Sequence, residues 1–317
     1  MFDLAIIGGG PAGVAAGVYA ARKQLKTVLI ADVLAGQSVE SLEIQNWIGT
    51  DKISGAELTR SLERHLRAYA NDFVEIHVGE RAQKLEKSAG GFLITTPKGP
   101  YEARALLIAT GGTRRKLDVP GASQFENKGV TYCASCDGAL FAGQDVVVVG
   151  GGNAGFETAA QLLAYCRSVT LIHRGDDCSK ADPSTFRAVT AHPNMKVILN
   201  TEPVKILGSQ FVEGVAVKNR KTGEESTVAA TGVFVEIGMM PSTGFINGVV
   251  KLDDIGRVVT NPKNQRAFVL GTPAADGVGA GVWAAGDCTD ELYHQNNIAA
   301  GDAVKALEDI YFWLKSR

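Results

Sequence analysis

The sequence predicts an α/β fold in which one β-α-β unit occurs twice, the second copy inserted into the first. Two similar stretches carry the repeat, "LAIIGGGPAG" (4–13) and "VVVVGGGNAG" (146–155). Each is an apolar strand that leads through G-x-G-x-x-G into a helix. A second strand follows, and 24 residues separate the first glycine from its end in both copies, Gly8 to Asp32 and Gly150 to Arg174. The shared spacing predicts two Rossmann-like, three-layer nucleotide-binding domains.

The remaining elements follow in chain order. Apolar or amphipathic patterns predict the helices and strands 14–24, 27–32, 60–75, 105–112, 156–166, 169–174 and 281–290. We expect the first and last parts of the chain, residues 1–114 and 245–317, to form one domain. Residues 115–244 would form a second domain that is inserted into it. The crossings, near 111–121 and 240–249, are rich in Gly, Pro, Ser and Thr. Two linkers across one boundary are typical of a hinge.

The two glycine-rich turns have a physical role in binding a dinucleotide. The first Gly permits the tight turn, the second lets the backbone approach a pyrophosphate, and the third lets helix and strand approach each other. The helix N-terminus then offers free N–H groups to the phosphates. The alternative is a turn that needs Gly only for its backbone angles. The candidate residues are Gly8, Gly10, Pro11, Ala12 and Gly13, and in the second copy Gly150, Gly152, Asn153, Ala154 and Gly155.

Net charge and the length of apolar runs indicate which classes of partner the protein is expected to lack. The formal net charge is −2, which argues against a nucleic-acid or anionic-membrane partner. The chain starts directly with a strand and a glycine turn, without a basic leader, and no run of 18 apolar residues occurs. We therefore expect a cytoplasmic protein that does not span a membrane.

The stretch "YCASCDGALF" (132–141) contains the one C-x-x-C motif, Cys133 and Cys136. A zinc site usually needs four ligands in close pairs, and no second pair stands at a matching spacing, so no metal is expected. The two-residue spacing instead lets both sulfurs reach disulfide geometry. A helix that begins at "DGALF" would stabilise a thiolate through its dipole. The motif therefore predicts a redox-active dithiol.

Taken together, these motifs resemble the low-molecular-weight thioredoxin reductase family, which is class II of the pyridine nucleotide-disulfide oxidoreductases. The reductase module of the alkyl hydroperoxide reductase flavoprotein is similar. The resemblance covers nearly the whole chain and includes "GGGPAG", "AGQSVESLEIQNWIG", "ATGG", "GVTYCASCDGALF", "GGGNAG", "VTLIHR", "FVEIGMMPST", "AAGDCTD" and "YHQNNIAAG".

The resemblance implies FAD in the split domain. Gly8, Gly10 and Gly13 would hold its pyrophosphate, and Asp32 is the candidate for the adenosine ribose, with a plain turn residue as the alternative. The rest of the implied flavin site consists of Gln37, Asn46, Thr110, Gly111, Gly286, Asp287 and Gln295. His294, next to Gln295, is a further candidate for a flavin contact, with a role at the start of a helix as the alternative. Thr110 and Gly111 would cover the flavin, Asp287 would bind the ribityl chain, and Gln295 would close the site.

The resemblance also assigns roles around the dithiol. Cys136 would accept electrons from the flavin, and Cys133 would attack the disulfide of thioredoxin or a similar small protein. Asp137 would act as acid and base, although it also suits the N-cap of the following helix. The family further implies a homodimer whose inserted domain rotates.

The electron donor stays open. NADPH-dependent members carry two adjacent arginines and a third four residues later, after a strand ending in His. Here "HRGDDCSKAD" keeps His173 and Arg174, but Gly175 and Ser179 replace the other two arginines, and two acids follow. NADPH, NADH, ferredoxin or a second flavin are the candidates. The stretch 261–281 is also about ten residues longer than is usual before "AAGD".

Three functions fit this pattern. The first is an FAD-dependent thioredoxin-disulfide reductase. The second is an FAD dithiol oxidase that passes electrons to oxygen. The third is a flavoprotein sensor or structural module without turnover, whose cysteines only change its conformation.

Overall fold

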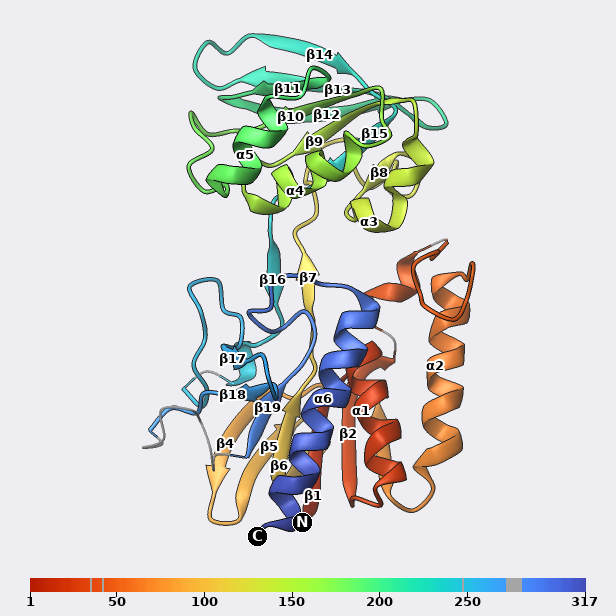
Figure 1. The fold of residues 1–317 in the computed structure, drawn as a ribbon, viewed down its shortest axis with the longest axis vertical. Coiled ribbons are helices and arrows are strands. Elements are labelled where there is room, and N and C mark those ends of the chain that lie inside the picture. The colour runs from red at the N-terminus through yellow and green to blue at the C-terminus, as the bar shows by residue number, and fades with distance from the viewer. Residues whose placement is uncertain (35, 42, 247, 272–280) are drawn as a thin grey trace. The chain divides into compact units, whose positions relative to one another are not determined.

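The structure, a computed structural model, describes residues 1–34, 36–41, 43–246, 248–271 and 281–317. It consists of two compact units (Figure 1). Unit 1 is Met1–Thr113 with Met240–Arg317, and unit 2 is Arg114–Met239. Unit 2 is thus inserted into the chain of unit 1. The structure divides the chain at 113/114 and 239/240, whereas the expected boundaries were 114/115 and 244/245.

Unit 1 is built on a nine-stranded sheet. The main path runs β17-β18-β19-β6-β1-β2-β3, and the hairpin β4–β5 joins through β5 and β6. Strands β6, β1, β2 and β3 are parallel, and β19 is parallel to β6. The elements are β1 (Phe2–Gly9), α1 (Pro11–Arg22), β2 (Thr27–Leu34), α2 (Gly55–Ala70), β3 (Val74–Val78), β4 (Lys84–Ser88), β5 (Gly91–Thr96), β6 (Gly99–Ile108), β17 (Thr260–Asn261), β18 (Arg266–Ala267), β19 (Val282–Ala284) and α6 (Asn296–Lys315), with 3-10 turns at Gly36–Glu40 and Gly244–Ile246.

Strand alternation divides unit 1 into three layers. Leu4 and Ile6 of β1 face α1 and α6, whereas Ala5 and Ile7 face the layer that contains β4 and β5. These four side chains are at most 3% exposed. Figure 1 shows α1, α2 and α6 along one side of the parallel strands. A parallel sheet covered on both faces is typical of nucleotide-binding α/β folds.

Local sequence explains where α2 begins and ends. Ser54 and Glu57 form a capping box, in which the Ser54 hydroxyl accepts from the Glu57 N–H and the Glu57 carboxylate accepts from the Ser54 N–H, both at 3.2 Å. Asn71 then ends the helix with φ 41°. The prediction of a helix over 60–75 was therefore displaced, because it overlooked this cap and the return to strand at β3.

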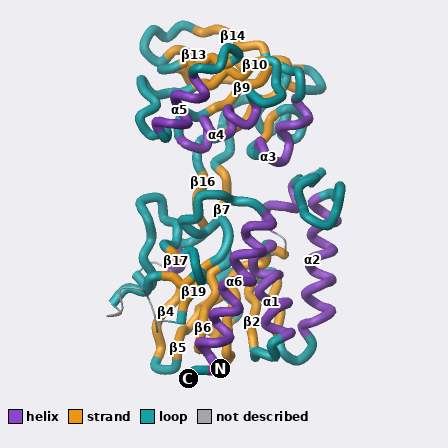
Figure 2. The backbone as a smooth tube through the Cα atoms, in the orientation of Figure 1, coloured by secondary structure: helices purple, strands orange, loops and turns teal. Residues whose placement is uncertain are grey.

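Unit 2 contains a second parallel sheet, β11-β10-β9-β15-β8, and an antiparallel sheet, β12-β13-β14. In Figure 2 the helices of this unit lie along one side of β9 and β10. The elements are β8 (Val130–Thr131), α3 (Ala134–Asp137), β9 (Asp145–Val149), α4 (Asn153–Leu162), β10 (Ser168–Ile172), α5 (Pro183–Thr190), β11 (Met195–Ile198), β12 (Thr201–Gly208), β13 (Val212–Asn219), β14 (Glu225–Ala229) and β15 (Gly232–Val235), with a 3-10 turn at Gly138–Phe141.

Two hydrophobic clusters hold the layers of unit 2 together. Val146 and Val148 of β9 pack with Phe156 of α4 on one face. Val147 and Val149 pack on the opposite face with the antiparallel sheet. The run of four valines thus serves both faces, which is why it reads as continuously apolar.

The two connections between the units, β7 (Gly112–Arg114) and β16 (Met239–Pro241), pair with one another as a two-stranded sheet. The predicted hinge lies in these segments and stays a prediction. Within the 261–281 stretch, β17 and β18 pair as antiparallel strands, and 272–280 lie outside the described residues. Among the helices described, none is long and apolar enough to cross a membrane.

Candidate active site

Cys133 and Cys136 are joined by a disulfide, with their Cα atoms 5.3 Å apart. Strand β8 ends at Thr131, and Cys133 is the N-cap residue of the short helix α3. The backbone N–H groups of Cys136 and Asp137 donate to the Cys133 carbonyl at 3.2 and 3.0 Å. This first turn folds the chain back on itself and brings the two sulfurs together. The helix therefore begins at Ala134, three residues before the predicted start at Asp137.

Thr131 connects the disulfide to Asp137. Its hydroxyl donates to the Asp137 carboxylate and accepts from the Cys133 N–H, the latter at 3.3 Å. Burial raises the pKa of the Asp137 carboxyl, although the Thr131 hydrogen bond and the Arg114 charge oppose the shift. A carboxyl whose pKa lies closer to neutrality is better suited to donate a proton to a departing thiolate.

The other three cysteines carry free thiols. Burial raises the pKa of Cys166 and of Cys288 to about 11, and it also raises the pKa of Cys178. A thiol needs its thiolate form to react, so none of the three competes with the disulfide pair in nucleophilicity.

The first glycine turn has the geometry of a phosphate-binding loop. Gly8 has φ +119°, and a Cβ there would lie 2.1 Å from the Ala109 carbonyl oxygen. A Cβ on Gly13 would lie 1.9 Å from the Gly8 carbonyl oxygen. A Cβ on Gly10 would meet nothing within 4 Å. Gly8 and Gly13 are thus required by the protein, whereas Gly10 faces open space at the uncapped N-terminus of α1.

Distant segments bring several predicted flavin residues together. The Asn46 amide donates to the Gln295 side chain at 3.0 Å across 249 residues of sequence. The Gln37 amide donates to the Gly112 carbonyl, next to the predicted Gly111. Gly286 and Asp287 follow β19 on the strand next to β6, which leads to Thr110. Thr110, Gly286 and Asp287 therefore lie just beyond the carboxyl ends of neighbouring parallel strands, where α/β folds bind ligands.

Two predicted residues have buried polar atoms without a conventional partner. His294 Nε2 is buried and makes no hydrogen bond within the described chain. The Thr110 hydroxyl is buried too and, apart from the nearby Cys288 thiol, has no partner among the described residues. Because buried polar atoms are nearly always paired, these two atoms point to a ligand in unit 1.

Asp32 is placed differently from the other candidates. Strand β2 continues to Leu34, so Asp32 lies inside the strand and not at its end as predicted. Its side chain is 55% exposed and forms an ion pair with Arg81 at 2.9 Å. An adenosine ribose would have to compete with Arg81 for this carboxylate.

The second glycine turn has the same backbone geometry and the same close approaches as the first. Gly150 has φ +129°, and its Cβ would lie 2.1 Å from the Glu236 carbonyl oxygen. A Cβ on Gly155 would lie 1.9 Å from the Gly150 carbonyl oxygen, and a Cβ on Gly152 would meet nothing within 4 Å. The N-terminus of α4 carries no side-chain cap from its N-cap residue. Both turns therefore leave open space at the middle glycine, beside a helix N-terminus without a side-chain cap.

The segment after β10 surrounds this second turn. His173 Nδ1 accepts from the Gly151 N–H at 3.2 Å, and burial, followed by the charge of Arg174, lowers the pKa of its imidazole. Arg174 is exposed. Asn153, at the start of α4, accepts from the Asp182 N–H at 2.5 Å and thereby ties the segment to the helix. Ala154 follows on the exposed side of α4.

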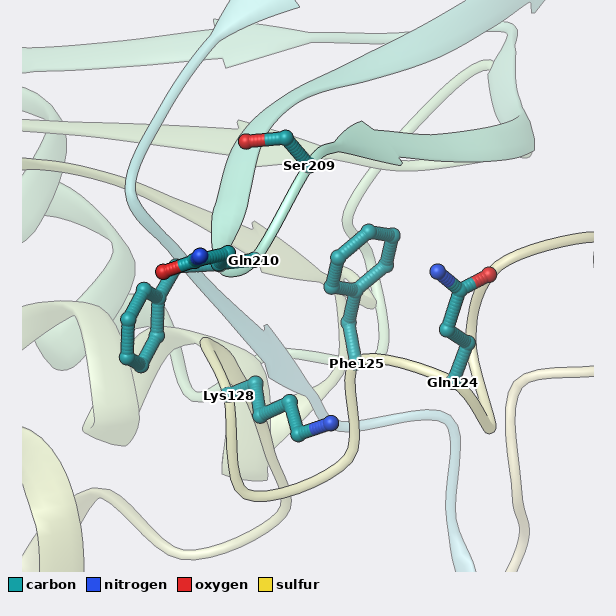
Figure 3. A pocket seen from close by; sticks show the side chains of 6 residues that line it. Gln124, Phe125, Lys128, Ser209 and Gln210 are labelled. Carbon is teal, nitrogen blue, oxygen red and sulfur yellow. The ribbon is translucent and has the colours of Figure 1, made fainter.

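Sequence reasoning did not select Thr131 or Glu236 as functional residues. Both stand inside quoted motifs, "GVTYCASCDGALF" and "FVEIGMMPST", but their partners are set by the fold. A hollow of about 370 Å³ in unit 2 is lined by Gln124, Phe125, Lys128, Ser209, Gln210 and Phe211, as Figure 3 shows. None of the predicted site residues lines it. Within the described ranges, no group of three or more His, Cys, Asp or Glu side chains could hold a metal ion.

Comparison with known proteins places these features in a family. Residues 2–303 match the family model described as pyridine nucleotide-disulphide oxidoreductase. Thioredoxin reductase from Streptococcus pyogenes is 34% identical with a TM-score of 0.87, and covers 100% of this chain and 99% of its own. Thioredoxin reductase from Giardia duodenalis is 32% identical with a TM-score of 0.90, and 99% of both chains is covered.

Longer curated proteins are also similar. NADH dehydrogenase of Bacillus subtilis is 35% identical over 305 residues, which is 96% of this chain and 57% of that protein. An alkyl hydroperoxide reductase component of Pseudomonas putida is 36% identical over 308 residues, 96% of this chain and 56% of that protein. The chain thus spans a little over half the length of these curated relatives.

The two glycine turns and the C-x-x-C disulfide stand in a two-unit α/β fold that is similar to that of thioredoxin reductases. The chain belongs to the pyridine nucleotide-disulphide oxidoreductase family. Proteins of this family use FAD and NAD(P)H. The predicted family and α/β fold class are therefore confirmed.

Proposed function

We propose that this chain is an FAD-dependent disulfide reductase that takes electrons from NADH and passes them, through Cys133 and Cys136, to the disulfide of thioredoxin or a similar small protein. The observation that carries the proposal is the Cys133–Cys136 disulfide beside Asp137. The Thr131 hydroxyl connects the two, because it accepts from the Cys133 N–H and donates to the Asp137 carboxylate. The similarity to two thioredoxin reductases over nearly their whole length supports it.

The residues of unit 1 fit FAD. The open side of Gly10 and the uncapped start of α1 suit a pyrophosphate. The buried His294 Nε2, the buried Thr110 hydroxyl, whose partner is the Cys288 thiol, and the Asn46–Gln295 pair offer polar contacts to a flavin ring system. When bound, FAD supplies a two-electron carrier that matches both a hydride donor and a dithiol.

The dithiol chemistry follows from thiol–disulfide exchange. The Cys133 thiolate attacks one sulfur of the substrate disulfide, and the other substrate sulfur leaves as a thiolate that Asp137 protonates. The Cys136 thiolate then attacks Cys133, which re-forms the internal disulfide and releases the second substrate thiol. Two electrons have passed from the pair to the substrate. The raised pKa of Asp137 supports its part as the acid.

The surroundings of the second turn favour NADH over NADPH. A 2′-phosphate carries extra negative charge and needs basic partners. Arg174 is available, but two acids, Asp176 and Asp177, follow after Gly175. Asp177 is held in place because it accepts from the Ser179 N–H and hydroxyl at 3.0 and 2.7 Å. A relative of 35% identity is named NADH dehydrogenase, which is in keeping with this choice.

The test is anaerobic and uses the FAD-loaded chain. We expect NADH to bleach the flavin absorbance at lower concentrations than NADPH, and oxidised thioredoxin to restore it. Cys136→Ser should keep the bleaching and lose thioredoxin reduction. Cys178→Ser, a change to a free thiol outside the motif, should keep both and serves as the matched control.

Three results would contradict parts of the proposal. If neither nucleotide bleached the flavin but dithionite followed by thioredoxin cycled it, the donor would be another reductant such as ferredoxin. If thioredoxin failed while a dithiol substrate drove peroxide formation in air, the chain would be a dithiol oxidase. If the flavin bound but nothing turned over, the sensor hypothesis would stand.

A second substrate class follows from the curated relatives. The alkyl hydroperoxide reductase component is 36% identical over 96% of this chain but extends well beyond it. In its reduced dithiol form, the Cys133–Cys136 pair would then reduce the disulfide of the carrier protein in a peroxide-reducing system. Parallel assays with thioredoxin and with a two-cysteine peroxiredoxin plus its dithiol carrier would separate the two, since only the true acceptor should show saturation.

A further inference from the structure

The two glycine turns are nearly identical, but the side chains behind them differ. In unit 1 the residue whose carbonyl meets the first glycine is Ala109, and Ala16 stands three residues after the third glycine. Both alanines are at most 5% exposed and belong to one hydrophobic cluster. In unit 2 the same two places are taken by Glu236 and Thr158. A carboxyl and a hydroxyl thus replace an apolar pair.

This polar pair is well organised. The Thr158 hydroxyl donates to Glu236 Oε1 at 2.9 Å. Arg114 Nη1 lies 3.8 Å from the same oxygen, and the Glu236 side chain is 11% exposed. Burial raises the pKa of the Glu236 carboxyl, and Arg114 and Thr158 only partly offset this cost. Placing a carboxyl here is unfavourable for stability compared with the alanine pair of unit 1, so stability alone does not account for it.

The position of Glu236 relates it to one half of a dinucleotide. In a Rossmann-like unit the pyrophosphate sits on the first turn, and the adenosine ribose lies at the end of the next strand. Here that strand is β10, on one side of β9, and it leads to Arg174. The other half must extend to the opposite side of β9, over β15. Glu236 directly follows β15 and donates its N–H to the Val149 carbonyl at 2.8 Å.

We propose that Glu236, held by Thr158, is a specificity-determining residue that accepts a hydrogen bond from the nicotinamide riboside half of the donor. The donor atom is either a ribose hydroxyl or the carboxamide N–H, both of which suit a carboxyl acceptor. This inference rests on the proposed function only in that the second turn binds a pyridine nucleotide. It adds a contact made by the Glu236 side chain, which stands behind the second glycine turn where the first turn has Ala109.

The experiment compares ligands that contain or lack that half. The FAD-loaded chain and the double variant Glu236→Ala/Thr158→Ala are titrated with NAD⁺, ADP-ribose and ADP by calorimetry. The double variant recreates the alanine pair of unit 1, a packing that the same fold already accommodates. We expect its Kd for NAD⁺ to rise about tenfold or more and its Kd for ADP to stay within about twofold. Glu236→Gln, which keeps an acceptor, should recover part of the loss.

ADP-ribose locates the contact. A loss shared by ADP-ribose and NAD⁺ assigns it to the ribose hydroxyls, and a loss seen with NAD⁺ alone assigns it to the carboxamide. Glu225→Gln, on an exposed part of β14, is the matched control and should change none of the three affinities. An equal loss for ADP and NAD⁺, or no loss for either, would overturn the assignment of Glu236. If the wild-type chain bound none of NAD⁺, ADP-ribose and ADP, the nucleotide-binding part of the proposed function would be overturned, and this inference with it.

Discussion

The hydroxyl of Thr131 donates to the carboxylate of Asp137, and the same oxygen accepts the N–H of Cys133. One side chain thus sets the position of the proposed acid relative to the disulfide. Because the hydrogen bond favours the charged carboxylate, it also holds the pKa of Asp137 below the value that burial alone would give. Thr131 therefore influences both where the proton donor lies and the pH at which it is protonated.

Removing the Thr131 hydroxyl should shift a pH profile. The pKa of Asp137 is raised by burial, so the acid form persists to a higher pH than for an exposed aspartate, and activity that needs the acid falls as pH rises through that pKa. In Thr131→Val the opposing hydrogen bond is lost, the pKa rises further, and the falling limb of kcat for disulfide reduction should move to higher pH. Asp137→Asn should lower kcat roughly 10²- to 10⁴-fold.

The control for this profile is Ser135→Ala. The Ser135 hydroxyl belongs to the same motif but donates to Gln161 at 3.1 Å. Its removal should leave the limb in place. An unchanged profile in Thr131→Val would show that Asp137 is not the titrating acid.

The residue after Asp137 is packed too tightly for a side chain. A Cβ on Gly138 would lie 2.2 Å from the Tyr165 hydroxyl oxygen, although its backbone angles, φ −57° and ψ −38°, suit alanine. Gly138→Ala should therefore lower the free energy of unfolding by roughly 1–3 kcal/mol through overpacking alone. Adding Tyr165→Phe, which removes the clashing oxygen, should restore most of the loss in a double-mutant cycle followed by denaturation. Additive effects would rule out the clash as the cause.

The two glycine turns predict separable losses of ligand. Gly10 and Gly152 both have φ below zero, −71° and −94°, and both face open space. Gly10→Ala should leave the free energy of unfolding of the flavin-free chain within about 1 kcal/mol and raise the Kd for FAD about tenfold or more, because the methyl group displaces the pyrophosphate. Gly152→Ala should instead weaken the binding of NAD⁺ and leave the retention of FAD unchanged.

These two variants serve as controls for each other. Loss of both ligands in either one would mean that the turns do not bind separate nucleotides. The measurements are flavin retention after gel filtration and calorimetric titration with NAD⁺.

A buried carboxylate in unit 1, Glu80, should make stability depend on pH. Glu80 is 2% exposed and accepts from the Thr96 hydroxyl and from the Tyr101 hydroxyl, the latter at 3.0 Å. Burial works to raise its pKa, but these hydrogen bonds, with the charges of His77 and Lys98, outweigh burial and leave the pKa below its ordinary value. A lowered carboxyl pKa stabilises the fold above the unfolded-state pKa, about 4.3, and this contribution is lost as pH falls through the folded-state value.

Tyr101→Phe removes one of these hydrogen bonds. It should lower the free energy of unfolding at pH 7 by about 1–3 kcal/mol and lower it less near pH 4, where the carboxylate begins to be protonated. Tyr69→Phe, on the exposed side of α2, is the control and should have little effect at either pH. A pH-independent loss in Tyr101→Phe would indicate packing and not the carboxylate.

The sequence by itself determined the parts that depend on local backbone geometry. The G-x-G-x-x-G turns and the C-x-x-C pair could be read directly, because Gly8 and Gly150 need left-handed φ values and two cysteines three residues apart can reach each other on one turn. The family and the α/β fold class followed from the order of these motifs. Helix ends were less well predicted, since a capping box such as Ser54–Glu57 is short and easily overlooked.

Only the tertiary structure decided which side chains meet. Asn46 and Gln295 are 249 residues apart in sequence, and Thr158 and Glu236 are 78 apart, yet each pair shares a hydrogen bond. Asp32 was a candidate by position, but the fold pairs it with Arg81, a residue that no local pattern connects to it. Such contacts depend on how strands are ordered in a sheet. Strand order is set by packing of both sheet faces over the whole unit, and a single stretch of sequence does not encode it.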